Sequence, residues 1–194
     1  MNLICVGQEM TVCPNLKTMT YGVFMKQTLI VMILMFTPFA YSGESCKEAA
    51  IGLDEKSDIA EKLFYTGTCH YRNKEYGLSV KNWEKLSSLT NVDPAYEEYQ
   101  IDVLNNLGYM KFYGYGTNKN QRLAVDYWQK AILMGHEEAE YHLCHAYADE
   151  GESTFHLAKA KKHCKKALLI YRGMDKKDME IINIIEKYKR QISR

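Results

Sequence analysis

Residues 107–139 read LGYMKFYGYGTNKNQRLAVDYWQKAILMGHEEA. Gly114 and Gly116 lie where a turn belongs, and glycine tolerates the positive φ that a tight loop requires. After them, apolar residues recur at spacings of three and four, which is the period of an amphipathic helix: Ala124, Tyr127, Trp128 and Ala131. The stretch therefore predicts a helical hairpin, with helices over 95–113 and 121–134.

The same pattern returns further along the chain. Residues 107–131 superimpose on residues 143–167 at a spacing of 36, with alanines coinciding at 124 and 160 and at 131 and 167. An earlier unit aligns through Trp83 with Trp128 at a spacing of 45, which predicts an insertion around Leu89 to Tyr99. A repeat period of this size is typical of stacked helical hairpins, and three units are visible.

The remaining helices follow from the same periodicity. We expect them near 57–72, 76–90, 137–149 and 155–171, in addition to the two of the central unit. Asp93-Pro94 is a helix start, and Asn120 suits the N-cap of the helix that follows it. A last amphipathic segment, 177–192, has the character of a helix that closes a repeat array. The sequence thus predicts an all-α domain.

The central unit resembles a Sel1-like repeat, a relative of the tetratricopeptide repeat. The residues that carry the resemblance are Leu107-Gly108, Tyr113-Gly114-Tyr115-Gly116, Ala124, Tyr127-Trp128, Lys130-Ala131, Gly135-His136 and Ala139. The third unit keeps part of this pattern without the Gly-x-Gly loop, and the first keeps little beyond Trp83 and Lys85. The resemblance implies a short right-handed α-solenoid of about three helical hairpins with a C-terminal capping helix, and it implies partner binding.

The amino-terminal residues have the features of an export signal. Lys26 precedes an apolar run of about 13 residues, from Thr28 to Ala40, and small residues stand at Ala40 and Ser42, the two positions that signal peptidase reads. That run is shorter than the roughly 20 residues that a spanning helix needs, so no stable membrane span is expected. We assign residues 25–42 to a signal peptide, 1–24 to a non-native upstream extension and 43–194 to the repeat domain, and we expect a periplasmic or secreted protein.

Removal of the leader retains an even number of cysteines in an oxidising compartment, which predicts two disulfides among Cys46, Cys69, Cys144 and Cys164. Cys144 lies on the first helix of the third unit, and Cys164 lies on the second helix, at the place that Trp128 fills in the central unit. A bond between them would join the two helices and, for a loop of about 20 residues, stabilise by roughly 3 kcal/mol. Cys46 with Cys69 would do likewise at the amino end, although sequence alone leaves the connectivity open.

Tyrosine is abundant, with 15 in the chain, and many belong to first helices or the loops after them. In a solenoid these helices line the concave face. Because tyrosine gives large contact area at low entropic cost, it often anchors interfaces, although repeat cores also use aromatics. Our candidate partner-binding residues are Tyr96, Glu97, Glu98, Tyr99, Tyr109, Tyr113, Tyr115 and Tyr141.

Charge is unevenly distributed along the expected mature chain. Residues 43–154 hold 19 acidic and 11 basic side chains, whereas residues 155–194 hold four acidic and twelve basic ones. A basic segment can bind nucleic acid, but an exported protein rarely meets it, so a solvated helix face or an acidic protein surface is favoured. We expect no nucleic-acid partner.

No nucleophile elbow, phosphate loop or metalloprotease motif is present in the expected mature sequence. His142 and His145, with His136 and Cys144 nearby, could suggest zinc, but two histidines three apart on a helix do not make a site by themselves. We therefore expect no metal, no cofactor and no enzymatic activity.

Three functions remain as hypotheses. The first is an exported protein-binding module, most specifically an immunity protein that neutralises a secreted antibacterial toxin, such as a phospholipase effector, by occlusion. Its contact would be a concave face rimmed by Glu97, Glu98 and Tyr99. The second is an envelope or host-exposed adaptor protein, and the third is a cysteine-rich, cell-wall-active hydrolase.

Overall fold

The computed structural model describes residues 45–193; the expected signal peptide and upstream extension lie outside this range. Within it, all regular structure is helical, as predicted, and no strand occurs. The elements of the described residues are η1 (Glu48–Ile51), α1 (Ile59–Arg72), α2 (Tyr76–Ser87), η2 (Pro94–Tyr96), α3 (Glu97–Tyr113), α4 (Gln121–Leu133), α5 (Ala139–Ala148), α6 (Leu157–Gly173) and α7 (Met179–Gln191).

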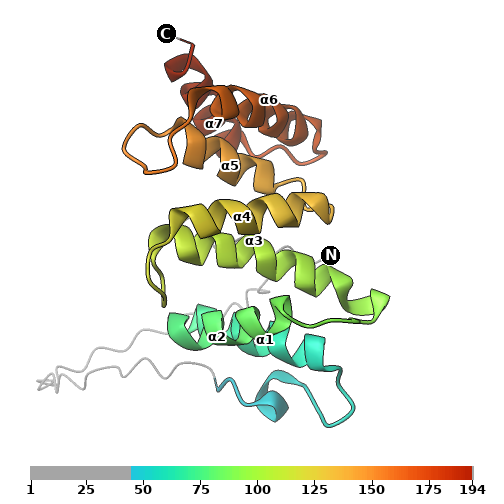
Figure 1. Ribbon diagram of the computed structural model, residues 1–194. Helices are drawn as coiled ribbons and strands as arrows, with labels where there is room; N and C mark the ends of the chain where they lie inside the picture. Colours follow the sequence, from blue (N-terminus) through green and yellow to red (C-terminus); the bar gives the residue numbers. More distant parts are fainter. Residues whose placement is uncertain (1–44, 194) are drawn as a thin grey trace, which may run out of the picture. The chain divides into compact units, whose positions relative to one another are not determined.

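Successive helices pack as neighbours, from α1 and α2 at one end of the stack to α6 and α7 at the other (Figure 1). The closest partners are α1 with α2, α3 with α4, and α5 with α6. We call these pairs the first, central and third hairpins. The hairpins meet where α2 packs on α3 and where α4 packs on α5, and α7 packs on both α6 and α5.

Helix ends follow the residues that the sequence places there. The side chains of Asp58, Asn120 and Asp178 each accept a hydrogen bond from a backbone N–H of the first turn of α1, α4 and α7. Such a cap satisfies one of the donors that a helix start leaves free. Helix α3 ends at Tyr113, and the next residue, Gly114, has a φ of 81°, a left-handed conformation that favours glycine.

The insertion predicted between the first two units lies between α2 and α3. Helix α2 ends at Ser87, before the predicted end at residue 90, and the side-chain amide of Gln100 donates to the carbonyl oxygens of Leu86 (3.2 Å) and Leu89 (2.9 Å). Gln100 thus satisfies the carbonyl of Leu89, just beyond α2, and adds a second hydrogen bond to the carbonyl of Leu86, which also accepts from the backbone N–H of Leu89. These bonds hold the turn that ends α2. The chain then forms the short η2 before α3, which has 17 residues.

A tight contact between glycine and tryptophan recurs in the first two hairpins. A Cβ atom built on Gly67 of α1 would lie 2.6 Å from the Trp83 ring of α2. The same atom on Gly108 of α3 would lie 2.4 Å from the Trp128 ring of α4. Each indole therefore occupies the space that a side chain on the facing helix would need, and glycine allows the two helices to approach.

The third hairpin fills the equivalent place with a disulfide. The spacing of 36 that aligns the units places Cys144 on Gly108 and Cys164 on Trp128, and the structure joins Cys144 to Cys164. A second disulfide joins Cys46 to α1 through Cys69. Both are the pairings that the sequence favoured. Their sequence separations of 20 and 23 correspond to about 3 kcal/mol of stabilisation each, through restriction of the unfolded chain.

Large aromatic side chains and small alanines share the core. Trp83, Phe112 and Trp128 are almost completely buried. The alanines that the repeat pattern singled out are fully buried in the second helices of the central and third hairpins: Ala124, Ala131, Ala160 and Ala167. None of the helices in residues 45–193 combines the length and the apolar character needed to cross a membrane.

Candidate functional site

Aromatic rings from several helices touch in series along one part of the molecule. Neighbouring ring centroids in this series are 4.8–6.4 Å apart, within the range of favourable aromatic contact. The series begins on the first hairpin, crosses α3 and α5 and ends on α7. We call it the tyrosine–histidine row, and its members in spatial order are Tyr71, Tyr76, Tyr115, Tyr109, Tyr113, His145 and Tyr188.

The Gly-x-Gly loop of the central hairpin positions the first half of the row. Gly116 has a φ of 65°, and a Cβ atom built on it would lie 2.2 Å from the backbone carbonyl carbon of Tyr76. The loop therefore rests directly on the start of α2, which only glycine permits. This contact brings the Tyr115 ring to 5.4 Å from the Tyr76 ring, so one tyrosine joins the first and central hairpins.

Hydrogen bonds hold the second half of the row. The His145 ring on α5 lies between two phenol oxygens, with Nε2 3.4 Å from Tyr113 Oη and Nδ1 2.7 Å from Tyr188 Oη. Burial lowers the pKa of His145, although Asp149 and Glu152 oppose this effect, so the ring is neutral near pH 7. A neutral imidazole has one donor and one acceptor. One tyrosine therefore donates to the ring and the other accepts from it, which links α3, α5 and α7.

Burial raises the pKa of four phenols of the row, so these groups are uncharged at neutral pH: Tyr71, Tyr109, Tyr113 and Tyr188. Burial, reinforced by neighbouring tyrosines, raises the pKa of Tyr109 to about 12. Burial is also the main reason that the pKa values of Tyr113 and Tyr188 lie well above 10. The row nevertheless reaches the surface, because Tyr113 is 41% exposed and Tyr115 is 40% exposed. It presents flat apolar rings with hydroxyl groups that can donate or accept hydrogen bonds.

Tyr141, another predicted residue, lies beside the row. Its ring is 5.3 Å from the His142 ring and 6.0 Å from the ring of buried Tyr171 on α6. His142 stacks on Trp128 at 5.0 Å and lies 6.3 Å from Tyr109, so it connects Tyr141 with the row. Burial and the nearby histidines lower the pKa of His142 to about 3, which keeps this ring neutral as well.

The other predicted residues form a separate group at the start of α3. The Tyr99 ring stacks on Phe64 of α1 at 4.5 Å, and Tyr99 Oη lies 3.3 Å from Tyr65 Oη. Tyr96 is the neighbour of Tyr99, with ring centroids 5.9 Å apart. Ten residues of helix, or about 15 Å, separate Tyr99 from Tyr109. This group therefore ties α3 to α1.

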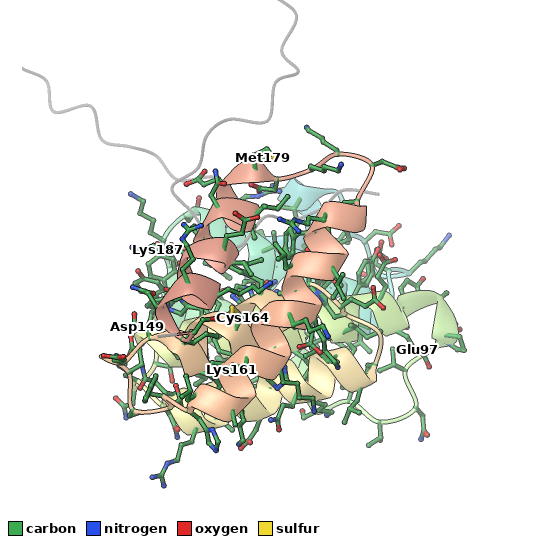
Figure 2. All side chains as sticks on the ribbon, turned by 90° about the horizontal axis from the view of Figure 1, so that it is seen from above. Glu97, Asp149, Lys161, Cys164, Met179 and Lys187 are labelled. Carbon is green, nitrogen blue, oxygen red and sulfur yellow. A yellow bond between two sulfur atoms is a disulfide. The ribbon has the colours of Figure 1, made fainter. Side chains whose placement is uncertain are left out.

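The predicted acidic rim lies with this second group. Glu97 and Glu98 are exposed in the first turn of α3, where a carboxylate interacts favourably with the helix dipole. Figure 2 shows Glu97 and Asp149 at opposite sides of the molecule, and Asp149 follows His145 at the end of α5. Glu97 and Glu98 thus do not border the α5 end of the row. The structure brings Tyr109, Tyr113 and Tyr115 together, with Tyr141 beside them.

Sequence reasoning did not include four members of the row: Tyr71, Tyr76, His145 and Tyr188. Tyr71 and Tyr76 flank the first interhelical turn, in the unit whose repeat pattern is weakest, so alignment with the central unit gave no reason to choose them. His145 was considered only as a metal ligand. Tyr188 is 43 residues from His145, a separation that no local pattern bridges. One sequence feature could have indicated that His145 belongs to the row: it lies one helical turn after Tyr141, which was predicted.

Two further groups of titratable residues have a structural role. Glu140 is buried in α5, where Oε2 lies 2.5 Å from His163 Nδ1 and Oε1 lies 3.0 Å from Lys166 Nζ, both on α6. Burial alone would raise the pKa of Glu140, but the two hydrogen bonds outweigh it and lower this pKa.

The other group, Cys46 with His70 and Glu75, brings three potential metal ligands together. The Cys46 sulfur is bonded to Cys69, however, so it is not a thiolate.

Comparison with protein-family models, with curated proteins and with solved structures finds no match to this chain.

Proposed function

We propose that this chain is a non-enzymatic, protein-binding module and that it binds its partner through the tyrosine–histidine row. The row itself is the observation that carries the proposal. It joins aromatic rings from different helices into one uncharged surface, with Tyr113 and Tyr115 partly exposed. Tyrosine is enriched among residues that dominate binding energy, and rings already held by neighbours lose little entropy on binding.

We further propose that the three hairpins form a short right-handed solenoid of the Sel1-like repeat family, capped by α7. The sequential packing of the helices and the recurring glycine–tryptophan contact support this architecture. In such an array the first helices of the hairpins line one face, which is commonly the binding face. Most members of the row come from α1, α3 and α5, the helices that would line it.

Export is part of the proposal. The two disulfides support it, because disulfides persist in oxidising compartments and are rare in the reducing cytosol. Residues 25–42 would be the signal peptide and residues 43–194 the mature domain. The protein would then act in the periplasm or outside the cell.

The most specific form of the proposal is an immunity protein that blocks a secreted antibacterial toxin, such as a phospholipase effector. It rests on the resemblance to small exported Sel1-like proteins. The mechanism would be occlusion: the row would cover the toxin's site and keep substrate out. Asp149 and Glu152, which lie near His145, would attract a basic patch on the toxin. Their main effect would be to raise the association rate constant.

The experiment is a matched pair of alanine variants in the full chain, expressed with a C-terminal tag in its host. Tyr115→Ala removes a row residue, and Tyr65→Ala removes an equally exposed tyrosine of the group around Tyr99, since both are 40% exposed. Proteins that co-purify without reducing agent are identified by mass spectrometry, and their affinity is measured. If Tyr115 is a hot spot, Tyr115→Ala lowers affinity by about 30-fold or more. Tyr65→Ala should bind like the wild type.

The outcomes separate the alternatives. One secreted toxin at a stoichiometric ratio supports the immunity protein, whereas several envelope proteins of moderate affinity support the adaptor. Equal losses for Tyr115→Ala and Tyr65→Ala would contradict the assignment of the binding surface to the row. Turnover of a cell-wall substrate by the purified chain would favour the hydrolase.

A further inference from the structure

The solvent-facing side of α6 is strongly basic. Between Leu157 and Gly173 the chain has no acidic residue. Every basic residue of the helix except His163 is exposed to solvent. We call this surface the α6 basic face, and it consists of Lys159, Lys161, Lys162, Lys165, Lys166 and Arg172.

The positions of these residues make one continuous stripe. At 100° per residue they fall within an arc of about 160° that runs the length of the helix, roughly 25 Å. Leu169 lies near the middle of this arc and is 65% exposed. Phe155 and Leu157 are 42% and 45% exposed at the amino-terminal end of the helix. The stripe therefore combines cations with a few apolar side chains that are partly exposed to solvent.

Among the described residues, only two of the six cations of this face are paired with a carboxylate. Lys166 pairs with Glu140, Arg172 pairs with Glu186, and Lys159 lies over the Tyr147 ring. Three others, Lys161, Lys162 and Lys165, have no described carboxylate within ion-pairing distance. Figure 2 shows α6, which carries Lys161, uncovered at the end of the stack. Like charges spaced one turn apart destabilise a helix slightly.

The composition of the stripe favours one class of partner. Lysine is depleted in the cores of protein–protein interfaces, where aromatic residues and arginine are enriched. The tyrosine–histidine row has that aromatic character, and the α6 basic face does not. Single-stranded nucleic acid is bound by a series of stacked aromatic side chains, whereas α6 itself exposes none and Phe155, just before it, adds a single phenyl ring. A cluster of four to eight lysines and arginines is instead typical of attachment to anionic lipid headgroups, with apolar side chains inserting at the interface.

We propose that the α6 basic face docks peripherally on the anionic headgroups of a phospholipid bilayer. The members of the row lie outside α6, on α1, α2, α3, α5 and α7 and in the loop after α3, so both surfaces can be used together. The docking does not depend on the proposed partner protein. For an exported chain this bilayer would be the outer leaflet of the inner membrane, and the partner would be met there.

The test is vesicle co-sedimentation of the full chain with its disulfides intact. The vesicles are phosphatidylcholine alone or phosphatidylcholine mixed with phosphatidylglycerol. One variant carries K161Q, K162Q and K165Q. The matched control carries K81Q, K85Q and K130Q, which removes three exposed lysines from α2 and α4. Circular dichroism checks that both variants are folded.

The wild type and the control should bind the anionic vesicles, more weakly as salt is raised, and should not bind pure phosphatidylcholine. Loss of three interfacial lysines should lower partitioning on the order of a hundredfold. Equal losses in the two variants, or no binding of the wild type at low salt, would overturn the proposal. So would tighter binding of an oligonucleotide or of polyglutamate than of the vesicles at the same salt concentration. None of these results bears on the Tyr115→Ala comparison, so the two proposals fail separately.

Discussion

Replacing Gly108 by alanine tests whether the glycine–tryptophan contact sets the spacing within a hairpin. The added Cβ atom would lie 2.4–2.7 Å from three atoms of the Trp128 ring, so this ring has to move by close to an ångström. The ring is 1% exposed, and its Nε1 donates to the Asn105 carbonyl oxygen at 3.1 Å. Overpacking a core costs about 1–3 kcal/mol, and a weakened hydrogen bond adds about 1 kcal/mol.

The helix itself gains from the change, because alanine is favoured over glycine inside a helix by about 1 kcal/mol. The net expectation for Gly108→Ala is a loss of about 1–3 kcal/mol in the free energy of unfolding. Gly173→Ala is the matched control, since no atom lies within 4 Å of its Cβ position in α6. It should be neutral or stabilising by up to about 1 kcal/mol.

Urea unfolding followed by circular dichroism, without reducing agent, measures both changes. Movement of Trp128 should also alter the tryptophan emission of the folded state in Gly108→Ala and leave it unchanged in Gly173→Ala. A Gly108→Ala protein as stable as the wild type would refute the argument. It would mean that the hairpin can widen at little cost and that the indole does not determine how closely α3 and α4 approach.

Replacing both Cys144 and Cys164 by alanine should lower the free energy of unfolding by about 3 kcal/mol in urea without reducing agent, and a loss below about 1 kcal/mol would contradict this origin of stability. Acid should destabilise the protein through His142, whose folded pKa of about 3 lies below its ordinary value of 6.5. The stability associated with its neutral form is therefore present above about pH 6.5 and is lost as the pH falls toward 3. Between pH 6.5 and 4.5, where Glu140 is still ionised, the wild type should lose about 2 kcal/mol more than His142→Phe. Parallel pH profiles for these two proteins would show that the His142 ring accepts a proton without cost.

Local sequence patterns, namely the spacing of apolar residues and the helix caps, were enough to predict most of the helices. The three-and-four spacing predicts α4 almost to the residue, and Asn120 caps it as expected. The repeat spacing of 36 places Cys144 and Cys164 on facing helices, which is why the sequence alone favours their pairing, and the structure confirms it. The predicted end of α2 was too late by three residues, because Gln100 from another helix holds the turn that follows Ser87 by donating to the carbonyl oxygens of Leu86 and Leu89.

The candidate site was predicted only in part, for a related reason. Tyr109, Tyr113 and Tyr115 are close in sequence, so helix geometry alone brings them together. Glu97 and Glu98 lie far from these tyrosines, because α3 is 17 residues long and its first turn is distant from its last. Their role as an acidic rim stays a prediction. Tyr188 joins the row through tertiary packing of α7 on α5, which no period within one helix encodes.

The hydrogen bond between Tyr188 and His145 also means that the row is complete only after α7 has packed against α5. Helix α7 supplies one of its members, so the surface is incomplete until residues 179–191 have been synthesised and α7 has docked. A chain that stops before α7 could still form its first two hairpins, since their glycine–tryptophan contacts are internal to each pair. Such a fragment would be folded in part but would leave the His145 ring without its closer phenol partner. The docking of α7 and the formation of the complete row are therefore coupled through the side chain of Tyr188.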